Sequence, residues 1–357
     1  MPLSSKSLRL SAFVFVCAAT VFALACNGGK SGGGAVKLQG AGATFPNPLY
    51  QKWIHEFGSA NANVQIDYQP IGSGGGIKQM QAQTVDFGAS DAPMTDDELK
   101  ASPGAVVHIP TVLGAVVVTY NLTGVSSALR FSPDVLADIF LGKITKWNDP
   151  RIKADNADAN LPAADISTVH RSEASGTSYV FTDYLSKVSA EWKEKAGANK
   201  SPKWIGGIGG KGNEGVTGQV KQTPNTIGYV ELAYAVQNKL PVAMIKNKAG
   251  NFVEPSVDAV TAAAAGTLAT TPDDLRVSIT NADGGTAYPI SSYTYVLAYQ
   301  DQKDAAKGKA VVDFLWWGIH DGQKFARDLQ YAPLPDEMVK RAEAKINSIA
   351  SGGKPLR

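Results

Sequence analysis

The sequence predicts an α/β fold. From Val36 onward, short runs rich in β-branched and aromatic residues alternate with segments whose apolar residues recur at helical spacing. The 357 residues, of which 44% are hydrophobic and 18% charged, have the composition of a globular protein and a length that suits about two domains. A small disulfide-stapled fold is excluded by size, and Cys17 and Cys26 form no readable disulfide framework.

The charge is nearly balanced, with 34 Lys and Arg against 32 Asp and Glu. Lys6 and Arg9 supply the whole excess of +2 and lie within the first 25 residues, which contain no acidic residue. The rest of the chain is therefore close to neutral, which argues against a nucleic-acid partner.

An export signal is predicted over residues 1–25. Lys6 and Arg9 precede the apolar stretch Leu10–Ala25, which is shorter than a membrane span and typical of a secretory signal. The stretch ends in Ala-Leu-Ala-Cys26, which resembles a bacterial lipoprotein signal and predicts a lipid on Cys26, followed by a flexible tether over 26–35. Ala-Leu-Ala also suits an ordinary signal peptidase, so a plain secreted form stays open.

The elements follow from periodicity and from turn residues. The first predicted helix places Leu49, Trp53 and Phe57 on one face, and another begins at Ser132-Pro133 and ends at Gly142. Further helices are expected over 180–188, 311–319 and 336–349. Strands are expected over 64–68, 105–109, 113–120, 166–170, 227–230, 242–245 and 293–299.

No linker-like composition divides the middle of the chain, which suggests two lobes that exchange strands at hinges inside β-runs. The two long runs, 113–120 and 293–299, are the expected crossings. This predicts one lobe from 36–113 plus 287–357 and a second lobe from 114–286.

Three turns of small residues each lead into a predicted helix: Gly40–Pro46, Gly72–Gly76 and Ser175–Thr177. Backbone N–H groups at a helix N-terminus are unpaired and the helix dipole is positive there, so an anion can bind at such a turn. One turn alone is most simply an ordinary helix cap. Three of them predict an anion site if the fold brings them together.

Two charged residues sharpen this prediction. Arg171 follows a predicted strand and stands four residues before Ser175, so its planar guanidinium can bind two oxygens of a tetrahedral anion. Asp91 closes the run that begins at Val85. A carboxylate beside an anion is repulsive unless it accepts a hydrogen bond from a proton on the ligand, or pairs with the arginine.

These segments resemble the phosphate-binding proteins of bacterial ABC-type phosphate importers, the PstS family. The resemblance covers about residues 38–356 and rests on six stretches in the same order. They are Gly-Ala-Gly-Ala-Thr-Phe-Pro at 40–46, Ile-Gly-Ser-Gly-Gly-Gly at 71–76, Val-Asp-Phe-Gly-Ala-Ser-Asp-Ala-Pro at 85–93, Arg-Ser-Glu-Ala-Ser-Gly-Thr-Ser at 171–178, Gly-Gly-Lys-Gly-Asn-Glu-Gly at 209–215 and Ile-Gly-Tyr-Val-Glu at 227–231.

The resemblance implies a two-lobed periplasmic binding protein fold of type II, each lobe a mixed β-sheet flanked by helices, with two hinge crossings. It implies a monomeric, non-enzymatic carrier without cofactor or metal, outside the cytoplasm, that delivers inorganic phosphate to membrane permease subunits. Membrane contact is expected only through a lipid on Cys26. The implied phosphate ligands are Thr44, Phe45, Ser73, Asp91, Arg171, Ser175, Gly176 and Thr177.

Two positions depart from the family pattern. Gly74 stands where relatives often have a second Ser, and His170 stands where a second Arg is common. Gly74 offers no hydroxyl, but its N–H is expected to remain available as a donor.

Phosphate near neutral pH keeps at least one proton and sulfate has none, so an ionised Asp91 would accept a bond from phosphate and repel sulfate. A sulfate or molybdate binder is the alternative within the same class. An exported phosphatase is the alternative enzyme, although no nucleophile with an adjacent base and no metal ligands are evident.

A Gly-x-Gly-x-x-Gly spacing at Gly207–Gly212 lacks the preceding strand that a dinucleotide site needs, so we interpret it as a helix entry near the cleft. The four histidines, His55, His108, His170 and His320, show no metal-ligand spacing.

Overall fold

The computed structural model describes residues 35–125 and 127–357, and Ala35–Arg357 form one compact unit. The predicted signal peptide over 1–25 and Cys26 with most of the tether lie outside the described residues. Within the described residues, no helix is long and apolar enough to cross a membrane.

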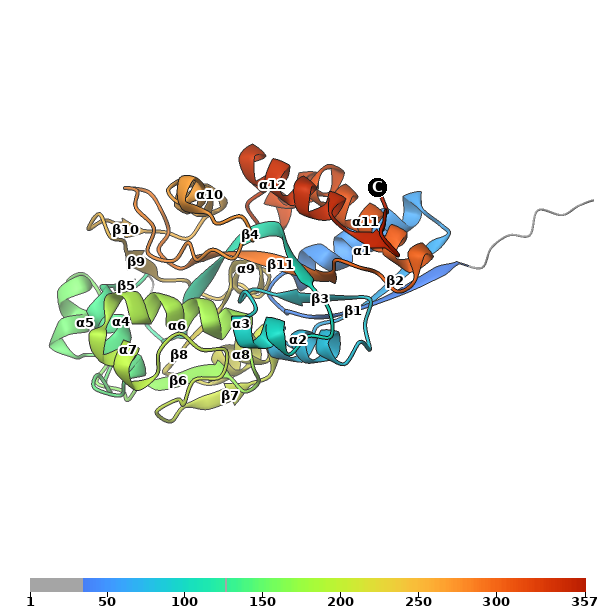
Figure 1. Cartoon of the computed structure of the whole chain (residues 1–357). Helices are drawn as coiled ribbons and strands as arrows, with labels where there is room; N and C mark the ends of the chain where they lie inside the picture. Colours follow the sequence, from blue (N-terminus) through green and yellow to red (C-terminus); the bar gives the residue numbers. More distant parts are fainter. Residues whose placement is uncertain (1–34, 126) are drawn as a thin grey trace, which may run out of the picture. The chain divides into compact units, whose positions relative to one another are not determined.

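The unit is built around an eight-stranded mixed sheet in the order β2-β1-β3-β11-β4-β8-β6-β7 (Figure 1). β1 is parallel to β2 and β3, and β6 is parallel to β7 and β8, whereas β4 and β11 run antiparallel to their neighbours. The strands are β1 Val36–Gly42, β2 Val64–Gln69, β3 Phe87–Ser90, β4 Val106–Asn121, β6 Ser167–Arg171, β7 Ile208–Gly210, β8 Thr226–Glu231 and β11 Ser291–Tyr299.

Helices flank this sheet, and the predicted α/β class is confirmed. The helices are α1 Asn47–Ala60, α2 Ser73–Gln81, α3 Asp96–Lys100, α4 Pro133–Phe140, α5 Pro150–Asp155, α6 Gly176–Val188, α7 Ala190–Lys195, α8 Gly212–Gln222, α9 Leu232–Gln237, α10 Val257–Ala265, α11 Ala305–Ile319 and α12 Asp336–Asn347. Two small sheets complete the unit, one of β5 Arg130–Phe131, β9 Met244–Lys246 and β10 Phe252–Val253, the other of β12 Ala350–Ser351 and β13 Lys354–Pro355.

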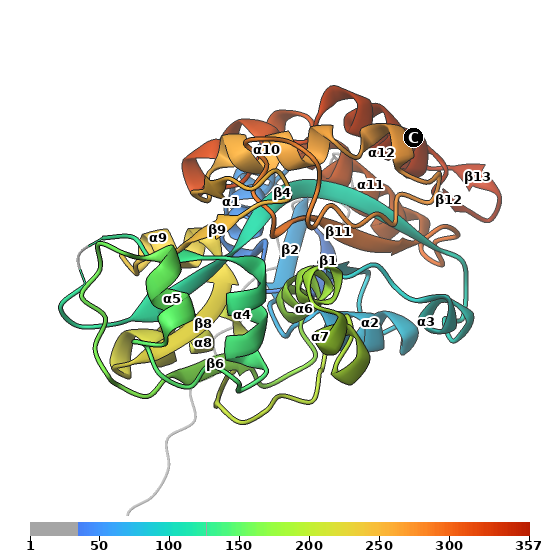
Figure 2. The ribbon, with the colours of Figure 1, turned by 90° about the vertical axis from the view of Figure 1, so that its left-hand side faces the viewer.

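β4 joins the two halves of the sheet. Figure 2 shows it as one long curved strand, which pairs with β11 as far as Ala115 and with β8 from Val116 onward. The sequence prediction of two separate strands, over 105–109 and 113–120, is wrong, because Pro110, Thr111 and Val112 continue the strand. The chain accommodates Pro110 by a register shift in the pairing opposite Thr294 and Tyr295, the kind of irregularity in which a strand tolerates a residue without an N–H. The division into lobes stays a prediction.

The sequence analysis missed β1 and β3. Both are short parallel strands that are buried toward their carboxyl ends, Gly40–Gly42 in β1 and all of Phe87–Ser90 in β3, so the alternation of polar and apolar residues that marks a half-exposed strand is weak or absent. Their positions matter because Thr44 and Asp91 directly follow them. The predicted helices α1, α2, α4, α6, α11 and α12 are confirmed, and the expected helix entry after Gly207–Gly212 is α8.

Candidate functional site

The predicted site residues lie at the carboxyl ends of parallel strands from both halves of the sheet. Thr44 follows β1, Asp91 follows β3, and Arg171 is the last residue of β6. In open α/β sheets this edge is the usual place for a ligand, because the loops leaving parallel strands meet there.

The N-termini of α2 and α6 meet at this edge. The N–H of Gly74 donates to the carbonyl of Ala174, one residue before the N-cap of α6, at 3.0 Å. Gly176, the first residue of α6, is so close to α2 and β3 that a Cβ placed on it would lie 2.4 Å from Ser73 Oγ and 2.5 Å from Asp91 Oδ2. Two of the three predicted anion turns therefore face one another directly.

The expectation for Gly74 is wrong in one respect. Its N–H is already used by Ala174, so it is not available to a ligand. A Cβ on Gly74 would also lie 2.4 Å from the Cβ of Ala174. The glycine at this position therefore permits close packing between two segments, and a serine would require the segments to move apart.

Arg171 is 3% exposed and held by groups from its own strand and from α6. Its Nη1 donates to Thr177 Oγ1 at 3.1 Å and its Nε to Glu173 Oε1 at 2.9 Å, and Nη2 also donates to Glu173 Oε1. A guanidinium has five N–H groups. Two of them therefore have no acceptor among residues 35–125 and 127–357, which is unusual for a buried polar group.

Asp91 is 1% exposed. Its Oδ1 accepts a hydrogen bond from Thr294 Oγ1 at 2.8 Å, and its backbone N–H donates to Ser73 Oγ at 3.2 Å. Burial raises the pKa of Asp91 from 3.8 to about 7, while the bond from Thr294 and the charge of Arg171 oppose that rise. The carboxyl group can thus exist in either protonation state near neutral pH.

The remaining predicted residues complete the cluster. Thr44 Oγ1 and Thr177 Oγ1 both accept from the side-chain amide of Asn213, at 2.9 and 3.2 Å. Ser175 caps α6 by accepting from the N–H of Ser178, and the carbonyl of Phe45 accepts from Tyr331 Oη at 2.6 Å. All eight predicted residues are buried.

Four further residues belong to the site and were not predicted. Asn213 and Glu173 lie inside the motifs that carry the family resemblance, so their motifs were the available signal. Glu231, at the end of β8, and Tyr331 hold the backbone around Phe45, and Tyr331 carried no sequence signal. Burial raises the pKa of Glu231 well above its usual value.

The His170 side chain packs on Trp204. Its ring stacks on Trp204, with centroids 4.9 Å apart, and its Nδ1 contacts the carbonyl of Arg171 at 3.0 Å. Within the part of the chain that the structure describes, no group of three or more His, Cys, Asp or Glu residues is arranged to hold a metal ion.

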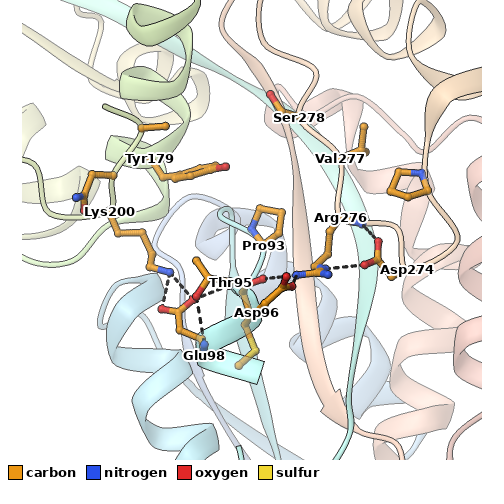
Figure 3. A pocket seen from close by; sticks show the side chains of 14 residues that line it. Pro93, Thr95, Asp96, Glu98, Tyr179, Lys200, Asp274, Arg276, Val277 and Ser278 are labelled. Carbon is orange, nitrogen blue, oxygen red and sulfur yellow. Dashed lines mark hydrogen bonds and ion pairs between the residues drawn. The ribbon is translucent and has the colours of Figure 1, made fainter. Parts of the chain in front are cut away.

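A surface pocket of about 760 Å³ lies beside the site (Figure 3). Pro93 and Met94, just after Asp91, line it together with Lys200, whose carbonyl accepts from the N–H of Ser175. Lys200 Nζ contacts both carboxylate oxygens of Glu98, at 2.6 and 2.7 Å. This ion pair joins α3 to the segment that follows α7.

Comparison with known proteins identifies the family. A family model described as the PBP superfamily domain matches residues 29–316. A phosphate-binding protein PstS of Xylella fastidiosa (strain 9a5c) is 47% identical over 311 residues, 87% of this chain and 85% of that protein. The chain belongs to the PstS family of phosphate-binding proteins. A PstS protein of Pasteurella multocida is 45% identical over 325 residues, covering 90% of this chain and 94% of that protein.

Solved structures have the same fold as this PstS-family chain. A phosphate-binding protein from Stenotrophomonas maltophilia has a TM-score of 0.68 at 24% identity, covering 88% of this chain and 96% of that one. A periplasmic phosphate-binding protein called PfluDING, bound with phosphate, has a TM-score of 0.69 at 22% identity, covering 87% and 93%. The predicted periplasmic binding protein fold is thereby confirmed, and the relatives are named as binding proteins rather than as enzymes.

Proposed function

We propose that this chain captures inorganic phosphate outside the cytoplasm and delivers it to the permease of an ABC transporter. The observation that carries the proposal is the buried guanidinium of Arg171 beside the N-termini of α2 and α6, of which two N–H groups have no acceptor among the described residues. A buried cation with unused donors next to two helix N-termini suits a small anion. The family membership supports phosphate as that anion.

The roles of the ligands follow from their chemistry. The hydroxyls of Thr44, Ser73, Ser175 and Thr177, the backbone of Phe45 and Gly176, and the guanidinium of Arg171 donate to phosphate oxygens. Asp91 accepts a hydrogen bond from the proton that phosphate keeps near neutral pH. Sulfate carries no such proton, so an ionised Asp91 disfavours it.

Calorimetric titration tests this proposal. The protein is unfolded and refolded to remove any bound ligand, then titrated with phosphate, arsenate and sulfate. We expect phosphate and arsenate to bind and sulfate to bind far more weakly at a pH above 7. Absence of phosphate binding, or turnover of p-nitrophenyl phosphate at ordinary enzyme rates, would contradict a carrier function.

Export and anchoring rest on residues 1–26, and the proposal includes a lipid on Cys26 that holds the protein at the outer face of the membrane. Mass spectrometry of the mature N-terminus distinguishes a lipid-modified Cys26 from a plain cleaved terminus. A Cys26→Ala variant is expected to be released from the membrane fraction.

Delivery to the permease predicts that phosphate uptake by membrane vesicles containing the transporter requires this protein.

A further inference from the structure

Asn213 joins two of the proposed phosphate ligands from opposite sides of the site. It lies in the first turn of α8 and is fully buried. Its Nδ2 donates to Thr44 Oγ1 at 2.9 Å and to Thr177 Oγ1 at 3.2 Å, and its backbone N–H also donates to Thr44 Oγ1 at 3.2 Å. Thr44 follows β1 and Thr177 belongs to α6, so one amide links the segments that carry the two threonines.

The orientation of this amide is fixed by a third bond. Asn213 Oδ1 accepts from the backbone N–H of Glu231 at 2.9 Å. A backbone N–H can only donate, so the oxygen must face Glu231 and the NH₂ group must face the two threonines.

Each threonine hydroxyl has two lone pairs and one proton. Both lone pairs of Thr44 Oγ1 are taken by Asn213, and those of Thr177 Oγ1 by Asn213 and by Arg171 Nη1 at 3.1 Å. Neither hydroxyl proton has an acceptor elsewhere in the described chain. Both O–H groups must therefore donate in a direction left open by these contacts.

We infer that Asn213 is the positioning residue that makes the hydroxyls of Thr44 and Thr177 obligatory donors toward one bound oxyanion. This inference rests on the proposed function, and it deepens the specificity of the same site. Oxygens facing Thr44 and Thr177 must be unprotonated, because neither hydroxyl can accept. Asp91 is the acceptor that we assign to the ligand proton, so the site matches an oxyanion with bare oxygens toward the two threonines and one O–H toward Asp91.

A double-mutant cycle separates this role from a merely structural one. In Asn213→Ala each threonine hydroxyl loses the bond from Nδ2 and regains one open lone pair, so it is no longer an obligatory donor. We expect the phosphate Kd to rise by about tenfold, the effect of about 1.4 kcal/mol. In the Thr177→Val background one of the two hydroxyls is already gone, so the same substitution should raise the Kd by clearly less. Fold-changes that simply multiply would indicate that Asn213 only supports α8.

Asn247 supplies the matched control. It is a buried asparagine whose amide donates to the carbonyls of Gly284, Gly285 and Ala287, none of which belongs to the site. Asn247→Ala is expected to lower the melting temperature and to leave the phosphate Kd within about twofold. When it is combined with Thr177→Val, the fold-change in Kd of the double variant should equal the product of the two single fold-changes.

A near-isosteric variant covers the case in which Asn213→Ala does not fold. Asn213→Asp replaces the donor by an acceptor, so both hydroxyls turn toward it and phosphate binding falls further than in Asn213→Ala. Binding as tight as in the unsubstituted protein would overturn the inference. If the unsubstituted protein does not bind phosphate, the proposed function fails, and the inference fails with it. If it binds phosphate and the fold-changes in Kd of Asn213→Ala and Thr177→Val multiply in the double variant, only the inference fails.

Discussion

The buried carboxyl group of Asp91 is the residue on which anion selection depends. Asp91→Asn removes the repulsion toward sulfate while keeping an oxygen that can accept from Thr294. We expect the ratio of sulfate to phosphate Kd to shrink by about tenfold or more. Calorimetry with both anions measures the ratio.

A carboxylate elsewhere provides the control for this substitution. Asp155 accepts from the N–H of Ser132 at 2.7 Å, away from the site. Asp155→Asn is expected to leave the ratio unchanged. An unchanged ratio in Asp91→Asn would remove the repulsion argument.

The raised pKa of Asp91, about 7, predicts a pH dependence of sulfate binding. Above that pKa the group is ionised and repels sulfate, and below it the neutral group can donate to a sulfate oxygen. Sulfate affinity should therefore rise as the pH falls through about 7. Burial also raises the pKa of the neighbouring Glu231 well above its usual value.

Sulfate titrations on either side of this pKa check the prediction, with Asp91→Asn as the control whose sulfate affinity is flat with pH. Sulfate affinity that stays constant, or that rises with pH, would contradict the assigned cause.

The ligands themselves were predictable from the sequence because short motifs carry them. Arg171, Ser175, Gly176 and Thr177 lie within seven consecutive residues, and a helix N-terminus after a strand has an unambiguous chemistry. The residues that orient the ligands were harder to find. Tyr331 reaches the carbonyl of Phe45 from 286 positions away, and periodicity does not report such contacts.

At the scale of elements, the approach of α6 to α2 depends on the missing side chain of Gly176. Gly176→Ala must separate α6 from Ser73 and Asp91, because its Cβ would lie within 2.5 Å of Asp91 Oδ2. Strain of about 1–3 kcal/mol is expected, which, if it falls on the bound state, corresponds to a phosphate Kd about five- to 150-fold higher. Calorimetry measures the loss, and circular dichroism checks that the helices persist.

Gly58 is the matched control, since it lies within α1 and an added Cβ meets nothing within 4 Å. Gly58→Ala should leave phosphate binding unchanged and stabilise the helix by up to about 1 kcal/mol. Equal Kd values for both alanine variants would show that the contact between the helix ends is not needed.

Half-exposed elements could be predicted from the sequence more easily than buried ones. Amphipathic helices such as α1 and α6 have a periodic apolar face, whereas β1 and β3 are buried toward their ends and leave little or no such pattern. β4 was predicted as two strands, and the pairing irregularity that lets it continue through Pro110 depends on Tyr295 in β11, 185 positions later. Local rules do not contain that information.

At the scale of the whole unit, Lys200 and Glu98 tie the two sides of the pocket in Figure 3 together. The pair is partly buried, so its contribution is modest, about 1 kcal/mol. If phosphate leaves through an opened cleft, Lys200→Ala should raise the dissociation rate by up to about fivefold and change the association rate little. Stopped-flow release measurements at low salt give both rates.

Lys195→Ala serves as the control, because Lys195 pairs with Glu191 within the single helix α7, so this ion pair does not link two elements. High salt should reduce the difference between Lys200→Ala and the unsubstituted protein, since screening weakens the ion pair. Identical release rates for both lysine variants would exclude a closing role for the pair.

The continuity of β4 also affects whether the two halves of the sheet can unfold separately. A strand bonded on one flank to β11 and farther along to β8 offers no exposed loop at which a protease could sever one half of the sheet from the other. Scanning calorimetry of the ligand-free protein should therefore record a single melting peak. Two separate peaks would mean that the halves keep independent stability despite the shared backbone.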